Sequence, residues 1–342
     1  MLKYLSVTVL LTLATTSVSA LTIKASTTTA ATTLFTKMFN EYQKRSNATV
    51  DFEPGTSPAA QKAILARSVD FAAAIIPLDE NEEVRDAEDV LHIPVALSAV
   101  VMTYNVPGLE RPLNFNGRVL SDIYFGRIKT WNDERIARLN PGVTLPNLLV
   151  TPVYRSDPSG YSAIFTNYLT KVSREWEARV NDSVIVDWPV GAATDSEDKS
   201  AKAVQAIPGA IGYMGLSRAL KDRLTFGNVQ NAAGTFVRPT ESSIEAAGNS
   251  KVTADGTANI TYAKVARAYP ISNYIYVLLR REQRYAGRTE AQAKATRDLV
   301  AWMIDDGQQY NASLYYGELS TDAANRAKKL LATLTFDGKP FR

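Results

Sequence analysis

Cysteine is absent from the 342 residues of this chain, and histidine occurs only once. Without thiols the chain can form neither a disulfide nor a thiolate metal site, and a lipid-modified N-terminal cysteine is excluded as well. A metal-dependent, phosphate-releasing hydrolase is disfavoured too, because a single histidine cannot build a His/Asp metal cluster. We therefore expect no metal and no cofactor.

Basic runs are also missing. The 38 lysines and arginines are spread along the chain and face 35 acidic residues, which gives a formal net charge of +3. A protein that follows a phosphate backbone needs clustered positive charge, so nucleic acid is not predicted as a partner. With 45% hydrophobic residues, a chain of this length can bury a large core, and we expect two globular units.

Long hydrophobic runs are absent apart from one short run at the N-terminus. Residues 1–20 read MLKYLSVTVLLTLATTSVSA, in which one basic residue precedes an apolar stretch that ends in small residues. This order is typical of a secretory signal peptide, and the apolar part is too short to span a bilayer. We expect cleavage after about Ala20 and a secreted monomer, periplasmic or extracellular, with no membrane span. The alternative is an ordinary apolar N-terminal strand.

The rest of the chain alternates short β-type runs with helical patterns, which is typical of an α/β fold with mainly parallel strands. The expected strands are residues 21–26, 48–54, 70–76, 95–104, 147–155, 184–190, 210–215 and 271–280. The clearest helical patterns cover residues 31–45, 58–67 and 290–307. No flexible linker separates two units, so we expect two lobes joined by crossing strands, with a ligand cleft between them.

Three strand-to-helix junctions carry hydroxyl side chains. They are Thr27–Thr29, Thr56-Ser57 before Pro58, and Ser159-Gly160. Each offers hydroxyl donors and free backbone N–H groups at a helix start, where the macrodipole favours negative charge. Together the junctions predict an anion site. The alternative is that these residues are ordinary helix N-caps, and a proline at the first helical positions fits that interpretation equally well.

Arg155 ends an apolar strand just before one of these junctions. A guanidinium there is costly to desolvate unless an anion meets it, and Asp157 can orient or partly neutralise it. This favours a ligand-binding arginine. The alternative is a structural pair of Arg155 and Asp157 with no ligand.

Catalytic residues are not indicated. His92 lies between apolar residues before Pro94, which predicts a packed structural histidine. Ser159 is not in a G-x-S-x-G turn and has no identifiable base. The acidic run 79–83 lacks the spacing of a calcium loop and is typical of a solvated face. The four tryptophans are scattered, as expected for core residues. We therefore expect a binding protein rather than an enzyme.

Several ordered segments resemble a known family. They are VDFAAAIIPL (69–78), LSDIYFGRIKTWNDERIARLNPGVTLP (120–146), AVQAIPGAIGYMGLSRAL (203–220), AYPISNYIYVLL (268–279) and DGKPFR (337–342). From about Leu21 to Arg342 the chain is similar to the periplasmic phosphate-binding proteins of bacterial phosphate ABC importers, which are PstS-like, type II periplasmic binding proteins. The resemblance implies that residues 21–99 with 272–342 form one lobe and residues 100–271 the other. It also implies a dehydrated phosphate as ligand and an ABC permease as partner.

The resemblance also implies the site residues. Arg155 matches the ligand arginine and Asp157 the acid that pairs with it. Ser159 and Gly160 match the donors at a helix start. In the first lobe, the matching positions are the hydroxyl donors Thr29 and Ser57 and the backbone N–H of Ala30.

Two positions depart from the family pattern. Ile75 stands where the family has an aspartate that accepts the proton of hydrogen phosphate and repels sulfate, and Tyr161 replaces a second donor, usually threonine. Loss of a buried acceptor costs about 1–3 kcal/mol, so we expect weaker discrimination between phosphate and sulfate. The alternative function is a repurposed binding fold that recognises another anion or a protein partner.

Overall fold

The computed structural model describes residues 21–78, 89–109 and 111–341, so the expected signal peptide and the acidic run 79–83 lie outside the described residues. Eight strands form a mixed sheet in the order β2-β1-β3-β11-β4-β8-β6-β7. Their bounds are β1 Leu21–Thr28, β2 Ala48–Gly55, β3 Phe71–Ala74, β4 Val90–Tyr104, β6 Thr151–Arg155, β7 Ala192–Thr194, β8 Ala210–Gly215 and β11 Ser272–Arg280. The expected α/β class is confirmed.

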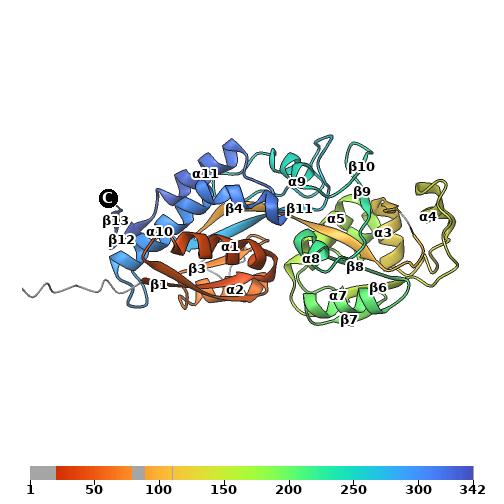
Figure 1. Ribbon diagram of the computed structural model, residues 1–342, viewed down its shortest axis with the longest axis horizontal. Coiled ribbons are helices and arrows are strands. Elements are labelled where there is room, and N and C mark those ends of the chain that lie inside the picture. The colour runs from red at the N-terminus through yellow and green to blue at the C-terminus, as the bar shows by residue number, and fades with distance from the viewer. Residues whose placement is uncertain (1–20, 79–88, 110, 342) are drawn as a thin grey trace, which may run out of the picture.

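The strands and helices form two groups, which β4 and β11 connect (Figure 1). We call the group with β1, β2 and β3 the first lobe and the group with β6, β7 and β8 the second lobe. β4 pairs with β11 through residues 90–99 and with β8 through residues 100–104, so it passes from one lobe to the other. The parallel pairs are β1 with β2 and β3, and β6 with β7 and β8, whereas the pairs that join the lobes are antiparallel.

Helices cover both lobes. Those of the first lobe are α1 Thr32–Gln43, α2 Ser57–Leu65, α10 Glu290–Ile304 and α11 Thr321–Leu331, with the short η1 Thr29–Ala31, η3 Asp306–Tyr310 and η4 Ala312–Leu314. Those of the second are α3 Gly117–Tyr124, α4 Glu134–Leu139, α5 Gly160–Val172, α6 Arg174–Arg179, α7 Glu197–Ala206 and α8 Leu216–Lys221. α9 Glu241–Gly248 packs on β4 and β11, and the minor strands are β5 Asn114–Phe115, β9 Asn228–Gln230, β10 Phe236–Val237, β12 Thr335–Phe336 and β13 Lys339–Pro340.

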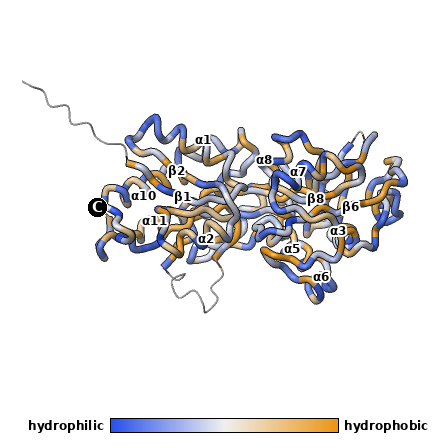
Figure 2. Tube along the Cα trace, turned by 90° about the horizontal axis from the view of Figure 1, so that it is seen from below, coloured by the Kyte–Doolittle hydropathy of each residue, from blue (hydrophilic) through white to orange (hydrophobic). Residues whose placement is uncertain are grey.

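The core of the first lobe shows why local patterns identified its elements. α1 buries its predicted apolar face, and its Phe39 ring packs edge-on against Phe52 and Phe71, with ring centroids 5.2 and 6.0 Å apart. Such aromatic pairs contribute about 0.5–1.5 kcal/mol beyond the burial of their area. Figure 2 shows hydrophobic stretches inside both lobes and hydrophilic stretches mainly on the outer turns. Among the described residues, no helix has the length and apolar character that crossing a membrane requires.

The expected strand at residues 184–190 is wrong, because this segment forms no strand. Its apolar residues serve a different purpose: Trp188 is buried, whereas Ile185 is 60% exposed. The carbonyl of Val184 accepts the N–H of Ser159 at 2.8 Å instead of pairing in a sheet. The Trp188 ring lies in an aromatic cluster with Tyr124, Tyr154, Phe165, Trp176 and Tyr213. Aromatic packing, not sheet formation, explains the pattern.

His92 is buried in β4, as predicted, and is 6% exposed. Its Nε2 atom accepts the N–H of Leu78 at 2.9 Å, and its ring packs edge-on against Tyr276. Burial lowers the pKa of His92 to about 4, so the ring is neutral at pH 7. The expected core positions of the tryptophans are confirmed as well, because all four are buried.

Candidate functional site

The first lobe brings two of the hydroxyl-bearing junctions to one end of its sheet. β1 and β2 pair in parallel with Thr28 opposite Gly55, so η1 and α2 begin beside each other. Thr28 Oγ1 accepts the N–H of Ala30 at 3.4 Å, and Thr56 Oγ1 accepts the N–H of Ala59 at 3.3 Å. These two threonines are therefore N-caps, which is what the alternative interpretation held.

The predicted donors Thr29 and Ser57 follow these caps directly. Ser57 is fully buried, and its Oγ accepts the N–H of Ile75 at 3.1 Å, which leaves its own hydroxyl hydrogen available. Thr29 is exposed and, with Ala30, lines a cavity between the lobes. The carbonyl of Ala30 accepts the hydroxyl of Tyr316 at 2.8 Å. The two hydroxyls thus lie in different surroundings.

Arg155 ends β6 in the second lobe and is 6% exposed. Its Nε and Nη2 atoms donate to the carboxylate of Asp157 at 2.6 and 2.5 Å, and its backbone N–H donates to the hydroxyl of Tyr213 at 3.1 Å. Burial alone would lower the pKa of Arg155, but the hydrogen bonds and charge of Asp157 hold it above its usual value. Among the described residues, no acceptor meets Nη1. The pair with Asp157 therefore orients a guanidinium that still has donors free.

The start of α5 adds backbone donors beside Arg155. Ser159 is the N-cap of this thirteen-residue helix, and its Oγ accepts the N–H of Ser162 at 3.5 Å. The backbone N–H groups of Gly160 and Tyr161 have no acceptor within the part of the chain that the structure describes. The macrodipole of α5 makes this end favourable for negative charge. The junction can therefore hold an anion even though Ser159 also acts as a cap.

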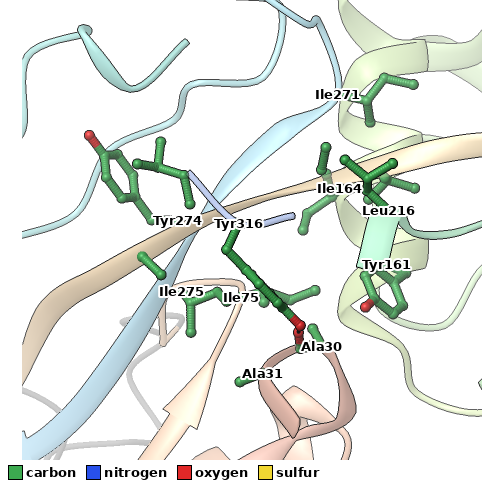
Figure 3. Close-up of a cluster of buried hydrophobic side chains, with 14 of the residues drawn as sticks. Ala30, Ala31, Ile75, Tyr161, Ile164, Leu216, Ile271, Tyr274, Ile275 and Tyr316 are labelled. Atoms are coloured by element: carbon green, nitrogen blue, oxygen red, sulfur yellow. Dashed lines mark hydrogen bonds between the residues drawn. The ribbon is translucent and has the colours of Figure 1, made fainter. Parts of the chain in front are cut away.

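The two lobes meet closely at Gly160. A Cβ atom there would lie 2.8 Å from Cγ1 of Ile75 and 2.9 Å from Oγ of Ser57, so only glycine permits this approach. Ile75 is buried between the lobes, and Figure 3 shows it in the same cluster as Tyr161 and Tyr316. The fold thus brings the expected donor Ser57 against the expected donor Gly160, and it places an aliphatic side chain beside both.

A cavity of about 340 Å³ opens between the lobes next to this contact. Thr29, Ala30 and Tyr161 line it, whereas Ser57, Arg155, Ser159 and Gly160 do not. Its other walls include Tyr316 from the loop before α11, together with Glu197 and Arg218 from the second lobe. The predicted residues are therefore divided between a closed contact around Gly160 and an open cavity beside it.

Comparison with known proteins identifies the family. The chain matches the PBP superfamily domain across residues 14–306. It is 34% identical over 280 residues to phosphate-binding protein PstS of Xylella fastidiosa strain 9a5c, an alignment that covers 81% of this chain and 75% of that protein. This chain belongs to the PstS family. It is also 32% identical over 319 residues to PstS of Pasteurella multocida strain Pm70, which covers 91% of each chain.

Solved structures place this PstS family member in the two-lobe periplasmic-binding-protein fold. The high-affinity periplasmic phosphate-binding protein PfluDING, solved with phosphate bound, superposes with a TM-score of 0.69. The alignment covers 90% of this chain and 93% of that one at 17% identity, a likeness that establishes the fold alone. The expected two-lobe architecture is thereby confirmed.

Sequence reasoning missed three side chains around the site of this PstS family member. Tyr213 supports Arg155 and shares a 2.7 Å hydrogen bond with Ser162. Tyr316 comes from a distant loop. Glu197 is the first residue of α7 and is only 7% exposed. Burial raises the pKa of Glu197 above its usual value, although the charge of Arg218, the hydrogen bond from the N–H of Gly215 and the charge of Arg155 oppose this rise. An acidic residue after a serine N-cap is typical of exposed helix starts, so no local signal distinguished it.

Proposed function

We propose that this PstS family member captures phosphate, or a closely related oxyanion, between its two lobes. The observation that carries the proposal is a set of donors for which the described residues provide no acceptor: Nη1 of Arg155 at the end of β6, and the N–H groups of Gly160 and Tyr161 at the start of α5. An oxyanion supplies several acceptors at once, and its hydrogen bonds with a guanidinium are charge-assisted. The phosphate-binding names of the relatives support the same ligand class.

In this proposal each predicted residue has a defined task. Asp157 holds the guanidinium of Arg155 in place, and that guanidinium supplies the positive charge. Ser159 and Gly160 contribute from the start of α5, while Ser57 donates its hydroxyl from the facing lobe. Thr29 and Ala30 bound the cavity side of the same site. No catalytic role is proposed for any of them.

We also propose that residues 21–99 with 272–342 and residues 100–271 act as two lobes that close on the ligand in a hinge motion. The exchange of partners along β4, from β11 to β8, supports a division at this point. α9 falls within residues 100–271 but contacts the other lobe: the carbonyl of its Gly248 accepts the hydroxyl of Tyr274 in β11 at 2.8 Å. Small-angle scattering should show a smaller radius of gyration with saturating phosphate. An identical radius, with binding confirmed independently, would contradict hinge closure.

Export and delivery complete the proposal. The protein is secreted after its first twenty or so residues are removed, as the order of residues in that segment predicts, and it passes its ligand to an ABC permease. The family to which the chain belongs supports this role, because its members are phosphate-binding proteins by name. The alternative is a repurposed protein for another anion, which Ile75 and Tyr161 favour, since both replace polar groups expected at the site.

Isothermal titration of the mature chain with phosphate and sulfate tests the ligand, and Arg155→Ala tests the site. Loss of a buried, charge-assisted contact should weaken binding by about 2–5 kcal/mol. Arg179→Ala is the matched control, because it removes an exposed arginine of the same lobe that pairs with Glu175. Equal anion affinity in the Arg155 variant and the wild type would overturn the assignment of Arg155.

A further inference from the structure

The cavity between the lobes extends beyond the proposed anion site. Its volume of about 340 Å³ falls within the range of about 300–1,000 Å³ typical of small-molecule pockets. Only its Tyr161 side adjoins the start of α5. The start of α7 and α8 form the rest of the second-lobe wall, and first-lobe residues, including Thr29 and Ala30, form the other wall. The cavity therefore offers room for a ligand that is larger than one tetrahedral anion.

Glu197 gives this wall a buried carboxyl group. Its Oε1 atom accepts the N–H of Gly215 at 3.3 Å, and Tyr161 lines the same cavity. The N–H donor is neutral. No cation lies within ion-pair distance of Glu197 among the residues that the structure describes. A buried carboxylate in such surroundings is costly unless a positive charge meets it.

The arginine in the cavity wall is already paired with other carboxylates. Arg218 forms ion pairs with Asp198 and, at 2.5 Å, with Asp222. Arg218 and Arg155 both act on Glu197 through space, without an ion pair to it. Each of these arginines is paired with another carboxylate. The cavity thus retains an acceptor for a cation.

The sheet places this carboxylate close to the anion site. β6 and β7 pair in parallel with Arg155 opposite Thr194, so α5 and α7 start at the same end of the second lobe. Tyr161 adjoins both: its backbone N–H is a donor at the start of α5, and its residue lines the same cavity as Glu197. The anion site and the carboxyl group of Glu197 therefore share a neighbouring residue.

We propose that this cavity is a second subsite and that the ligand is a phosphomonoester or phosphonate that carries an ammonium group on a short alkyl linker. The inference rests on the proposed function, since the phosphoryl group occupies the anion site at Arg155 and α5. The ammonium group lies in the cavity and donates to the carboxylate of Glu197. The ammonium group adds a Coulomb attraction to the carboxylate that a neutral hydroxyl lacks, so a hydroxyl in that position binds less well.

Three probes test the subsite by isothermal titration of the full mature chain: inorganic phosphate, 2-aminoethyl phosphate and 2-hydroxyethyl phosphate. The amine should bind at least about tenfold more tightly than the hydroxyl compound, which differs in one group. Equal affinities, or tighter binding of the hydroxyl compound, would overturn the proposal. If phosphate binds and neither ester does, the subsite is wrong while the proposed function stands. If none of the three binds, both fail.

Two variants assign the preference to Glu197. Glu197→Gln keeps the shape of the side chain and should reduce the ratio of the two ester affinities to near one. A ratio measured within one protein cancels any general loss of binding. Asp195→Asn removes an exposed carboxylate nearby, which pairs with Lys199 at 2.7 Å, and should retain the wild-type ratio. An unchanged ratio in Glu197→Gln, or an equal loss in both variants, would contradict the proposal.

Discussion

The single histidine makes the pH dependence of stability a sharp test of the fold. His92 is buried and neutral, with its pKa lowered to about 4 by burial, whereas an unfolded histidine titrates near 6.5. Below pH 6.5, His92 therefore binds a proton in the unfolded chain but stays neutral in the folded chain until the pH approaches 4. Folding becomes less favourable as the pH falls through this range. The stability contribution of His92 is complete above pH 6.5 and is lost as the pH falls towards 4.

The gap between these two pKa values corresponds to about 3.4 kcal/mol, of which about 2 kcal/mol should be lost by pH 5. Denaturant unfolding of the wild type and of His92→Gln between pH 7.5 and pH 5 measures this quantity. Glutamine keeps an acceptor for the N–H of Leu78 but has no proton to gain. The wild type should lose about 2 kcal/mol more stability than the variant over this range.

Glu197 changes the stability with pH in the opposite direction, so its contribution must be separated from that of His92. Because its pKa is raised by burial, its stability contribution is present at low pH and lost as the pH rises through its folded pKa. It does so equally in the wild type and in His92→Gln, so it cancels in the difference between them. Parallel stability curves for the two proteins would refute the burial of a neutral histidine at this position.

Two further predictions concern the contact between the lobes. Ile75→Asp should restore an acceptor for hydrogen phosphate and repel sulfate. In competition titrations, the difference between the binding free energies of phosphate and sulfate should therefore grow by about 1–3 kcal/mol in favour of phosphate. Strong sulfate rejection by the wild type, unchanged in the variant, would show that selectivity is set elsewhere. Gly160→Ala should place a methyl group against Ile75 and Ser57 and cost about 1–3 kcal/mol of ligand affinity as the lobes are held apart. A companion Ile75→Ala change should recover part of that loss, and full affinity in the single variant would contradict the close contact.

Local patterns determined elements of both lobes and the chemistry of the junctions. The face of α1 that includes Phe39, the strand β8 and the burial of His92 all follow from the spacing of apolar residues along a short segment. The hydroxyl-rich helix starts were visible for the same reason, since caps and free N–H groups are properties of one junction. Family resemblance then assigned the roles of Arg155 and its neighbours, which remain proposals for this chain.

Tertiary structure decided everything that depends on two distant segments. The meeting of Ser57, Ile75 and Gly160 arises from the approach of the lobes, and no periodicity within 57–75 or around 160 encodes it. Glu197 is buried where α7 begins beside Gly215 of β8, whose N–H it accepts, while the same acidic helix start elsewhere would be exposed. Residues 184–190 have a strand-like pattern but form no strand, because Trp188 packs in the aromatic cluster instead. Burial is a property of the surroundings, so a chain read one segment at a time specifies which groups are available and the fold specifies which of them meet.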